Sequence, residues 1–110
     1  DIVSAMEKDA GMPLAELKVD GGASRNNLLM QFQSDILGTQ VIRPEVTETT
    51  ALGAAYLAGL AVGFWRDVDD VKHQWKAERN FVPKAAVETV ACLKEHWHEA
   101  VERTLSKKAN

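Results

Sequence analysis

The chain has 110 residues, enough for one domain with a modest core. Its net charge is −3 and no basic cluster occurs, which argues against a nucleic-acid partner and against stable association with a membrane surface. The single cysteine, Cys92, excludes a disulfide within the chain and lies in a helical pattern, so we expect a buried or partly buried, unreactive thiol.

The sequence opens on an amphipathic helix, expected over residues 1–10. Ile2, Val3 and Met6 share one face of this helix, and Gly11 is expected to end it. No capping residue precedes the apolar face. We therefore expect the helix to continue from upstream chain, and the sequence to be a piece of a longer protein.

A glycine turn joins the next two elements. A short strand is expected over residues 16–20, followed by Gly21 and Gly22 and by a helix over residues 24–37 that Ser24 caps. Free N–H groups at such a turn favour a phosphate or the polar edge of a ring. The spacing matches neither a dinucleotide fingerprint nor a P-loop, so these residues alone leave two interpretations open: part of a nucleotide site, or a plain turn.

Three polar side chains flank this turn. Asn26 and Asn27 each offer an amide with donors and an acceptor. Asp20 either bonds the loop backbone or faces a cation through water, and we favour the structural role.

The helix over residues 24–37 should pack on one apolar face. The expected buried stripe is Leu28, Leu29, Phe32, Ile36 and Leu37, and the expected solvated side is Gln33, Ser34 and Asp35. A second strand follows over residues 39–43. Strand, helix and strand form a βαβ unit with parallel strands, which places the glycine turn at the carboxyl end of the first strand, where open α/β sheets bind ligands.

Three more helices are expected after the second strand. The first, over residues 51–63 with Thr49 or Thr50 as cap, is so rich in small and apolar residues that we expect it to be buried on nearly all sides. The second spans residues 68–76 with Asp67 or Asp69 as cap. Residues 79–83 are extended. The last helix, over residues 85–106, has one apolar face, consisting of Val87, Val90, Leu93 or Lys94, Trp97, Val101 and Leu105.

Catalytic and metal-binding patterns are not found. His96 and His98 are two residues apart on a helix and point in different directions, which makes them a poor metal pair. The sequence contains no serine–histidine–aspartate arrangement and no convincing carboxylate pair. We therefore assign no catalytic residue and no metal ligand to this chain.

Three motifs carry a resemblance to a known family. They are V-D-G-G-A-S-R-N-N, M-Q-F-Q-S-D-I-L-G and E-T-T-A-L-G-A-A-Y-L-A-G. The first resembles the FGGY carbohydrate kinases of the actin-like ATPase superfamily. The joint match of the other two points to the branch that phosphorylates glycerol, of the bacterial type. The resemblance is close from Asp1 to about Pro83 and looser over the last helix.

The resemblance implies an α/β fold, the C-terminal part of an actin-like (ribonuclease H-like) ATPase domain on the nucleotide side of the kinase, spanning residues 1–110. It implies a cytoplasmic, homo-oligomeric enzyme that transfers the γ-phosphate of Mg-ATP to glycerol. Matching positions make Gly22 a point of close approach to the nucleotide, Asn26 a contact to its adenosine part, and Gly21 a support of the turn.

The catalytic aspartate, the glycerol contacts and the phosphate loops of such kinases lie upstream of Asp1, so we expect the isolated chain to be inactive. Two alternatives remain. One is another FGGY sugar or polyol kinase. The other is a non-enzymatic α/β module that binds a partner through the small-residue helix.

Overall fold

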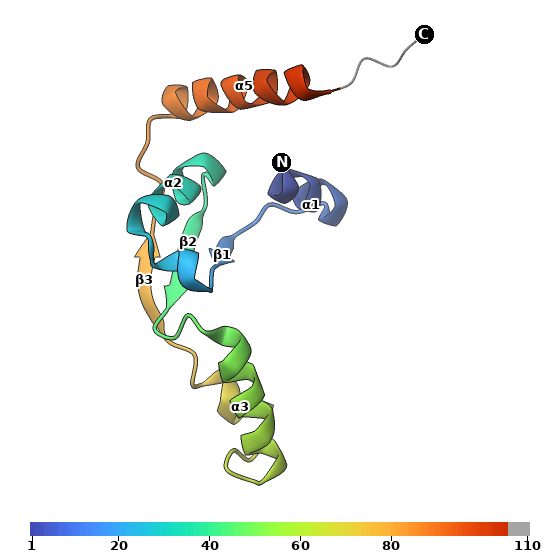
Figure 1. Cartoon of the computed structure of the whole chain (residues 1–110), viewed down its shortest axis with the longest axis vertical. Helices are drawn as coiled ribbons and strands as arrows, with labels where there is room; N and C mark the ends of the chain where they lie inside the picture. Colours follow the sequence, from blue (N-terminus) through green and yellow to red (C-terminus); the bar gives the residue numbers. More distant parts are fainter. Residues whose placement is uncertain (106–110) are drawn as a thin grey trace.

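The computed structural model describes residues 1–105. The chain is elongated, with extents of 62 × 38 × 28 Å and a radius of gyration of 18.7 Å. A compact domain of this length has a radius of gyration of about 13 Å. A small sheet lies in the middle, helix α3 extends from one end of it, and helix α5 lies beyond the other (Figure 1). The described residues therefore do not close around a single core.

The sheet has three strands in the order β1-β2-β3. They are β1 (Glu16–Lys18), β2 (Gln40–Pro44) and β3 (Ala77–Phe81). Strand β1 is parallel to β2, as the βαβ prediction requires, and β3 is antiparallel to β2. The first strand ends two residues sooner than expected, and the segment expected only to be extended forms the third strand. Strand β2 is central, so its side chains are the most buried of the three.

The helix expected over residues 24–37 is divided into two. A 3-10 helix, η1 (Gly22–Arg25), precedes α2 (Asn27–Leu37). The division lies at Asn26, whose backbone is extended and whose Oδ1 accepts the Leu29 N–H at 3.0 Å. The Ser24 cap prediction is therefore wrong. The Ser24 hydroxyl is buried and donates backwards to the Gly21 carbonyl at 2.6 Å.

Helix α2 packs on the sheet through a different face from the one expected. Met30 and Ser34, one turn apart, are buried against the sheet, while Leu28, Leu29 and Phe32 are exposed. The predicted stripe is thus wrong for these three leucine and phenylalanine positions. Buried Met30 joins Val41 and Phe81 in the apolar core, with Leu17 and Val19 packed against it.

Ser34, expected on the solvated side, is fully buried because its hydroxyl has partners in the sheet. Its Oγ lies 2.8 Å from the Thr39 carbonyl oxygen and 3.0 Å from that of Phe81, so it can donate to either. A buried hydroxyl is tolerated only with such a partner. The serine therefore serves as a polar contact between α2, the residue that precedes β2, and the end of β3.

Asp35, also expected to be solvated, ties the last helix to α2. Its Oδ1 accepts the backbone N–H groups of Lys84 at 2.7 Å and Ala85 at 3.3 Å. These bonds hold the pKa of Asp35 below its ordinary value of 3.8, and the bond from the Lys84 N–H has the largest effect. The linker they fix leads into α5 (Val87–Thr104), which starts two residues later than expected. The expected end at residue 106 lies outside the described residues.

A side chain of the last helix contacts Asp1, the residue before the first helix. Helix α1 (Ile2–Ala10) ends at Gly11, whose left-handed φ of 66° matches the predicted stop. The Trp97 indole of α5 donates to Asp1 Oδ2 at 2.8 Å.

Cys92 on α5 is exposed, which corrects the expectation of a buried or partly buried thiol. Helix α5 buries none of its side chains against the described part of the chain.

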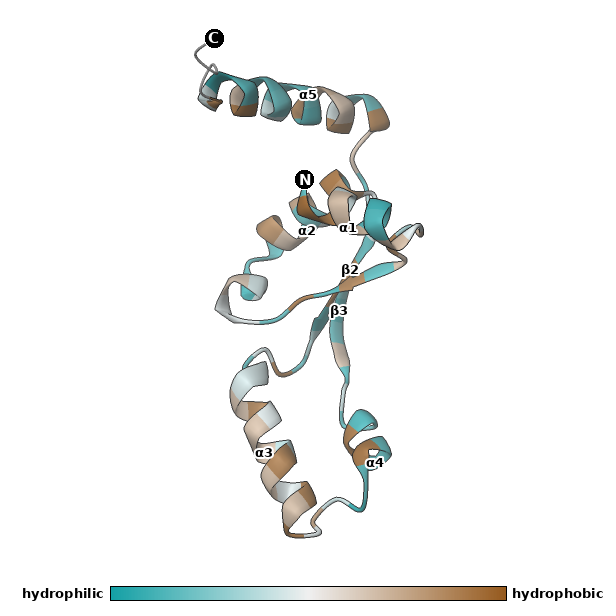
Figure 2. Cartoon of the chain, turned by 90° about the vertical axis from the view of Figure 1, so that its right-hand side faces the viewer, coloured by the Kyte–Doolittle hydropathy of each residue, from teal (hydrophilic) through white to brown (hydrophobic). Residues whose placement is uncertain are grey.

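Helix α3 (Thr49–Ala61) begins two residues before the expected start and ends two residues sooner. Thr49 and Thr50, the two expected caps, lie inside the helix, so that prediction is wrong. Glu48 occupies the cap position, and its side chain makes no capping hydrogen bond. No side chain of α3 is buried by residues 1–105, although the helix is largely apolar or neutral in hydropathy (Figure 2). The expected burial on nearly all sides is therefore not provided by this chain.

Helix α4 (Val68–Lys72) is capped by Asp67, one of the two residues predicted for this role. Asp67 Oδ1 accepts the Asp70 N–H at 2.9 Å. The helix ends four residues sooner than expected, because the chain turns at His73 and continues into β3 at Ala77.

Candidate functional site

The glycine turn lies at the carboxyl end of β1, between that strand and η1. Gly21 has φ 77° and ψ 171°, a conformation open essentially only to glycine. Its N–H donates to the Thr47 carbonyl at 2.8 Å, and its carbonyl accepts both the N–H and the hydroxyl of Ser24. Both sides of its peptide unit are therefore fixed, and the backbone itself requires glycine here.

Gly22 differs, because nothing in the described residues requires a glycine at this position. Its φ is not positive, and a Cβ built on it would meet no described atom within 4 Å. The residue is exposed, and the N–H groups of Gly22 and Ala23 donate no hydrogen bond within residues 1–105. The turn thus presents a bare stretch of backbone with two free donors, to which another molecule can come close.

The two asparagines that follow have separate roles. Asn26 uses its Oδ1 to cap α2, which leaves its Nδ2 amide group exposed as a donor beside the turn. Asn27 was expected to offer its amide in the same way, but its Oδ1 accepts a hydrogen bond from Arg43 at 3.0 Å. Among the expected polar groups, Asn26 therefore remains available next to the bare backbone.

The loop after β2 closes one side of the turn. Buried Thr47 accepts the Gly21 N–H through its carbonyl and the Arg25 Nε through its hydroxyl at 3.2 Å. Asp20 accepts the hydroxyl of Thr49, so its carboxylate bonds a side chain of the second loop. Loops from the carboxyl ends of two adjacent parallel strands thus meet, as they do around ligands in open α/β sheets.

Arg43 was not predicted to matter, yet it joins the turn to the sheet. It is buried within β2 and binds a group in η1, a group in α2 and Glu78 on β3. A charged residue between Ile42 and Pro44 in a strand that is otherwise apolar at its centre is the sequence signal that indicates a buried ion pair.

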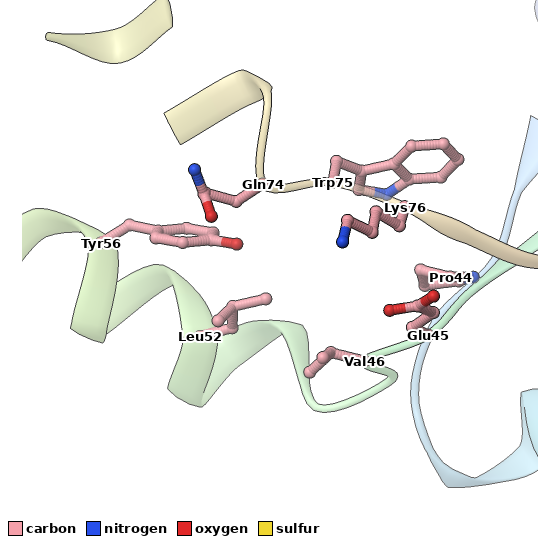
Figure 3. A pocket seen from close by; sticks show the side chains of 8 residues that line it. All are labelled: Pro44, Glu45, Val46, Leu52, Tyr56, Gln74, Trp75 and Lys76. Carbon is pink, nitrogen blue, oxygen red and sulfur yellow. The ribbon is translucent and has the colours of Figure 1, made fainter. Parts of the chain in front are cut away.

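A small cavity lies away from the turn, between the start of α3 and the segment that leads into β3. Figure 3 shows Tyr56 and Leu52 of α3 on one side of it and Gln74, Trp75 and Lys76 on the other. Its volume of about 40 Å³ leaves room for very few waters. This cavity is too small for a nucleotide or a sugar.

Two further observations concern residues 1–105. They contain no group of three or more histidine, cysteine or acidic side chains placed to hold a metal ion. None of their helices combines the length and the apolar character that a membrane span needs.

Comparison with known proteins identifies the family. The profile of the FGGY family of carbohydrate kinases, C-terminal domain, matches residues 1–62, more than half of the chain. The chain belongs to this family. Its mixed α/β architecture is accordingly that of FGGY kinases, which have the actin-like ATPase fold.

The chain is similar in sequence to bacterial glycerol kinases. The chain is 62% identical to that of Dechloromonas aromatica over 96% of its own length, and 58% identical to that of Deinococcus radiodurans over 94%. In both cases it spans 21% of the relative.

Solved structures agree with this family assignment. The glycerol kinase of Plasmodium falciparum, solved with ADP, superposes with a TM-score of 0.78 at 38% identity, over 96% of this chain and 21% of that one. The xylulose kinase of Lactobacillus acidophilus shares the fold at a TM-score of 0.61 and 17% identity, over 82% of this chain and 19% of its own. This FGGY chain thus spans about a fifth of the length of each of these kinases.

Proposed function

We propose that this chain is the C-terminal portion of a glycerol kinase, on the nucleotide side of the enzyme. The complete enzyme would transfer the γ-phosphate of ATP to glycerol and release glycerol 3-phosphate and ADP. The observation that carries the proposal is identity of about 60% to glycerol kinases over nearly the whole chain. Identity to a sugar kinase, the xylulose kinase of Lactobacillus acidophilus, is only 17%.

Within that enzyme, the turn of Gly21, Gly22 and Asn26 would form one wall of the ATP site. Gly21 sets the backbone in a conformation that only glycine adopts readily, which supports the turn. Gly22 leaves open space for the nucleotide to approach the backbone. The free amide group of Asn26 can donate to a ring nitrogen or a ribose oxygen of the adenosine.

The presence of ADP in the structure of the Plasmodium falciparum relative supports a nucleotide as the ligand. The bare N–H groups of Gly22 and Ala23 suit the negative charge of a phosphate or the polar edge of a base. This chain's role is therefore binding and orientation, because phosphoryl transfer depends on positioning and charge stabilisation.

Mg²⁺ accompanies ATP in phosphoryl transfer, where it neutralises charge on the β- and γ-phosphates. The described residues supply no cluster of acidic ligands, and Asp20 is already bonded to Thr49. We therefore place the ligands of Mg²⁺ on the nucleotide and on the remainder of the kinase. A cytoplasmic location fits the proposal, because that compartment supplies ATP.

The test is a substrate panel on the complete kinase that contains this chain. Purified enzyme with Mg-ATP is assayed against glycerol, xylulose and gluconate by coupling ADP formation to a visible readout. We expect glycerol to have the highest kcat/KM. A preference for one of the sugars would overturn the substrate and keep the family, and no phosphorylation of any polyol would favour the non-enzymatic alternative.

A further inference from the structure

Arg43 occupies an unusual place for a charged side chain, at the centre of the sheet. It lies on β2, the middle strand, and its side chain is only 8% exposed. Its guanidinium carbon lies 5.3 Å from the centre of the Phe81 ring, within the distance of a cation–π contact. A buried arginine is tolerated only where its N–H donors have hydrogen-bond acceptors.

Its donors reach both sides of the helix cap in the turn. Arg43 Nη1 donates to the Ser24 carbonyl in η1 at 2.8 Å and to Asn27 Oδ1 at the start of α2 at 3.0 Å. These two acceptors flank Asn26, the residue with the exposed amide. One nitrogen of the arginine thus ties both ends of the short segment Ser24–Asn27 to the sheet.

The charge of Arg43 is balanced from the third strand. Its Nε donates to Glu78 Oε2 at 2.6 Å, and this bond holds the pKa of Glu78 below its ordinary value of 4.5. The carboxylate stays ionised at neutral pH and keeps the guanidinium plane fixed. Strand β3 therefore orients Arg43 while η1 and α2 receive its other donors.

We infer that Arg43 is a positioning residue for the nucleotide, which acts through Ser24 and Asn27 and makes no contact with the nucleotide itself. The inference rests on the proposed function of the glycine turn. Held by Arg43, the Ser24–Asn27 segment keeps the bare backbone of Gly22 and the amide of Asn26 in one fixed relation. Without it, the turn keeps the bonds of Gly21 and Arg25 to Thr47, but η1 and the start of α2 lose this tie to the central strand.

The fork of an arginine is needed for this role. A planar guanidinium binds Glu78 through one nitrogen and the turn through another, at fixed angles. A lysine carries the same charge on a single nitrogen and cannot hold both groups in that geometry. Arg43→Lys is therefore the discriminating variant, because it keeps the charge and loses the bridge.

The experiment measures ADP and glycerol separately in the complete kinase. The dissociation constant of ADP and the KM of glycerol are determined for wild type, Arg43→Lys and Gly22→Ala. Arg79→Lys is the matched control, because Arg79 pairs with Arg43 in the sheet register, lies over the same Phe81 ring at 4.8 Å and donates to no group of η1 or α2. We expect Arg43→Lys to weaken ADP binding by about tenfold, as loss of a charged hydrogen bond would, with the KM of glycerol within about twofold. Arg79→Lys should change neither quantity.

The outcomes separate this inference from the proposed function. If Gly22→Ala weakens ADP binding and Arg43→Lys does not, the positioning role is wrong and the turn remains the nucleotide wall. If neither variant weakens ADP binding, the turn does not bind the nucleotide and both proposals fail. Equal losses for ADP and glycerol in Arg43→Lys would indicate a general structural defect and overturn the positioning role.

A second variant decides the case in which Arg43→Lys does not fold. Asn27→Ala removes one of the two acceptors and leaves the buried ion pair intact. A loss of ADP affinity at an unchanged unfolding temperature supports the inference, and unchanged affinity overturns it. Where both single variants fold, the double variant that carries Arg43→Lys and Asn27→Ala should bind ADP no more weakly than Arg43→Lys alone. Additive losses of ADP affinity would mean that Asn27 acts independently of Arg43, which contradicts the inference.

Discussion

The two neighbouring glycines of the turn should respond differently to the same substitution. Gly21 has a backbone conformation essentially limited to glycine, so Gly21→Ala introduces strain of about 1–3 kcal/mol. Gly22 has neither a positive φ nor a described atom within 4 Å of an added Cβ. Gly22→Ala should therefore leave the folded state unstrained, and it restricts the unfolded chain by about 0.4–1 kcal/mol in favour of folding.

The effect of Gly22→Ala should appear in nucleotide binding. If the nucleotide lies against the Gly22 backbone, an added methyl overpacks the contact at about 1–3 kcal/mol. At 1.4 kcal/mol for each factor of ten, ADP affinity falls by about 5- to 150-fold. The KM of glycerol should stay the same, because the turn contacts only the nucleotide in this reasoning.

The assay combines ADP titration by calorimetry with thermal unfolding of the complete kinase. Gly53→Ala on α3 is the control for ADP affinity, because it adds the same methyl group at a glycine of ordinary φ away from the turn. We expect Gly21→Ala to lower the unfolding temperature, Gly22→Ala to lower ADP affinity alone, and Gly53→Ala to leave ADP affinity unchanged. ADP affinity of Gly22→Ala within about twofold of wild type would refute the reasoning, since even the smallest expected overpacking exceeds that change.

Three further results are expected. The isolated 110-residue chain should phosphorylate no glycerol in a coupled assay, because we expect the catalytic base and the phosphate-binding loops to lie in the remainder of the kinase; measurable turnover would contradict this. Ser34→Ala should cost about 1–3 kcal/mol of stability, because it removes the hydroxyl that donates to a buried carbonyl, whereas exposed Ser4→Ala should have no effect on thermal unfolding. The pKa of Asp35 is lowered in the folded state, so the stability it contributes is present at neutral pH and is lost as the pH falls through that pKa. The difference in unfolding temperature between wild type and Asp35→Asn should accordingly shrink towards pH 3, and a constant difference would argue against an ionised Asp35 in this role.

The local features of the fold could be predicted from sequence because they depend on neighbouring residues. Gly11 ends α1 in the left-handed conformation, and Asp67 caps α4, as the residue types indicate. The parallel pairing of β1 with β2 follows from the strand–helix–strand order. Each of these predictions uses chemistry that acts within a few positions along the chain.

The turn itself shows where local rules stop. Ser24 and Asn26 are both good helix caps, and the sequence alone gives no reason to prefer the second. The choice depends on the 3-10 helix, in which the Ser24 hydroxyl bonds Gly21 and its carbonyl accepts a hydrogen bond from Arg43. Arg43 is 19 positions away from Ser24, so the preference is set by a tertiary contact that no pattern of neighbouring residues reveals.

Burial was the least predictable property, for a reason that also bears on function. Apolar residues at helical spacing indicate which face is apolar, yet they do not tell what covers it. Leu28 on α2, Leu57 on α3 and Trp97 on α5 are 80%, 71% and 57% exposed in the described chain. The chain spans about a fifth of the glycerol kinases it resembles, and side chains of this kind gain about 25 cal/mol per Å² when covered. We therefore expect these helices to depend on the remainder of the kinase for stability. The core of Met30, Val41 and Phe81 is instead formed by the chain itself, and Arg43 connects it to the proposed nucleotide wall, because it lies over the Phe81 ring and donates to Ser24.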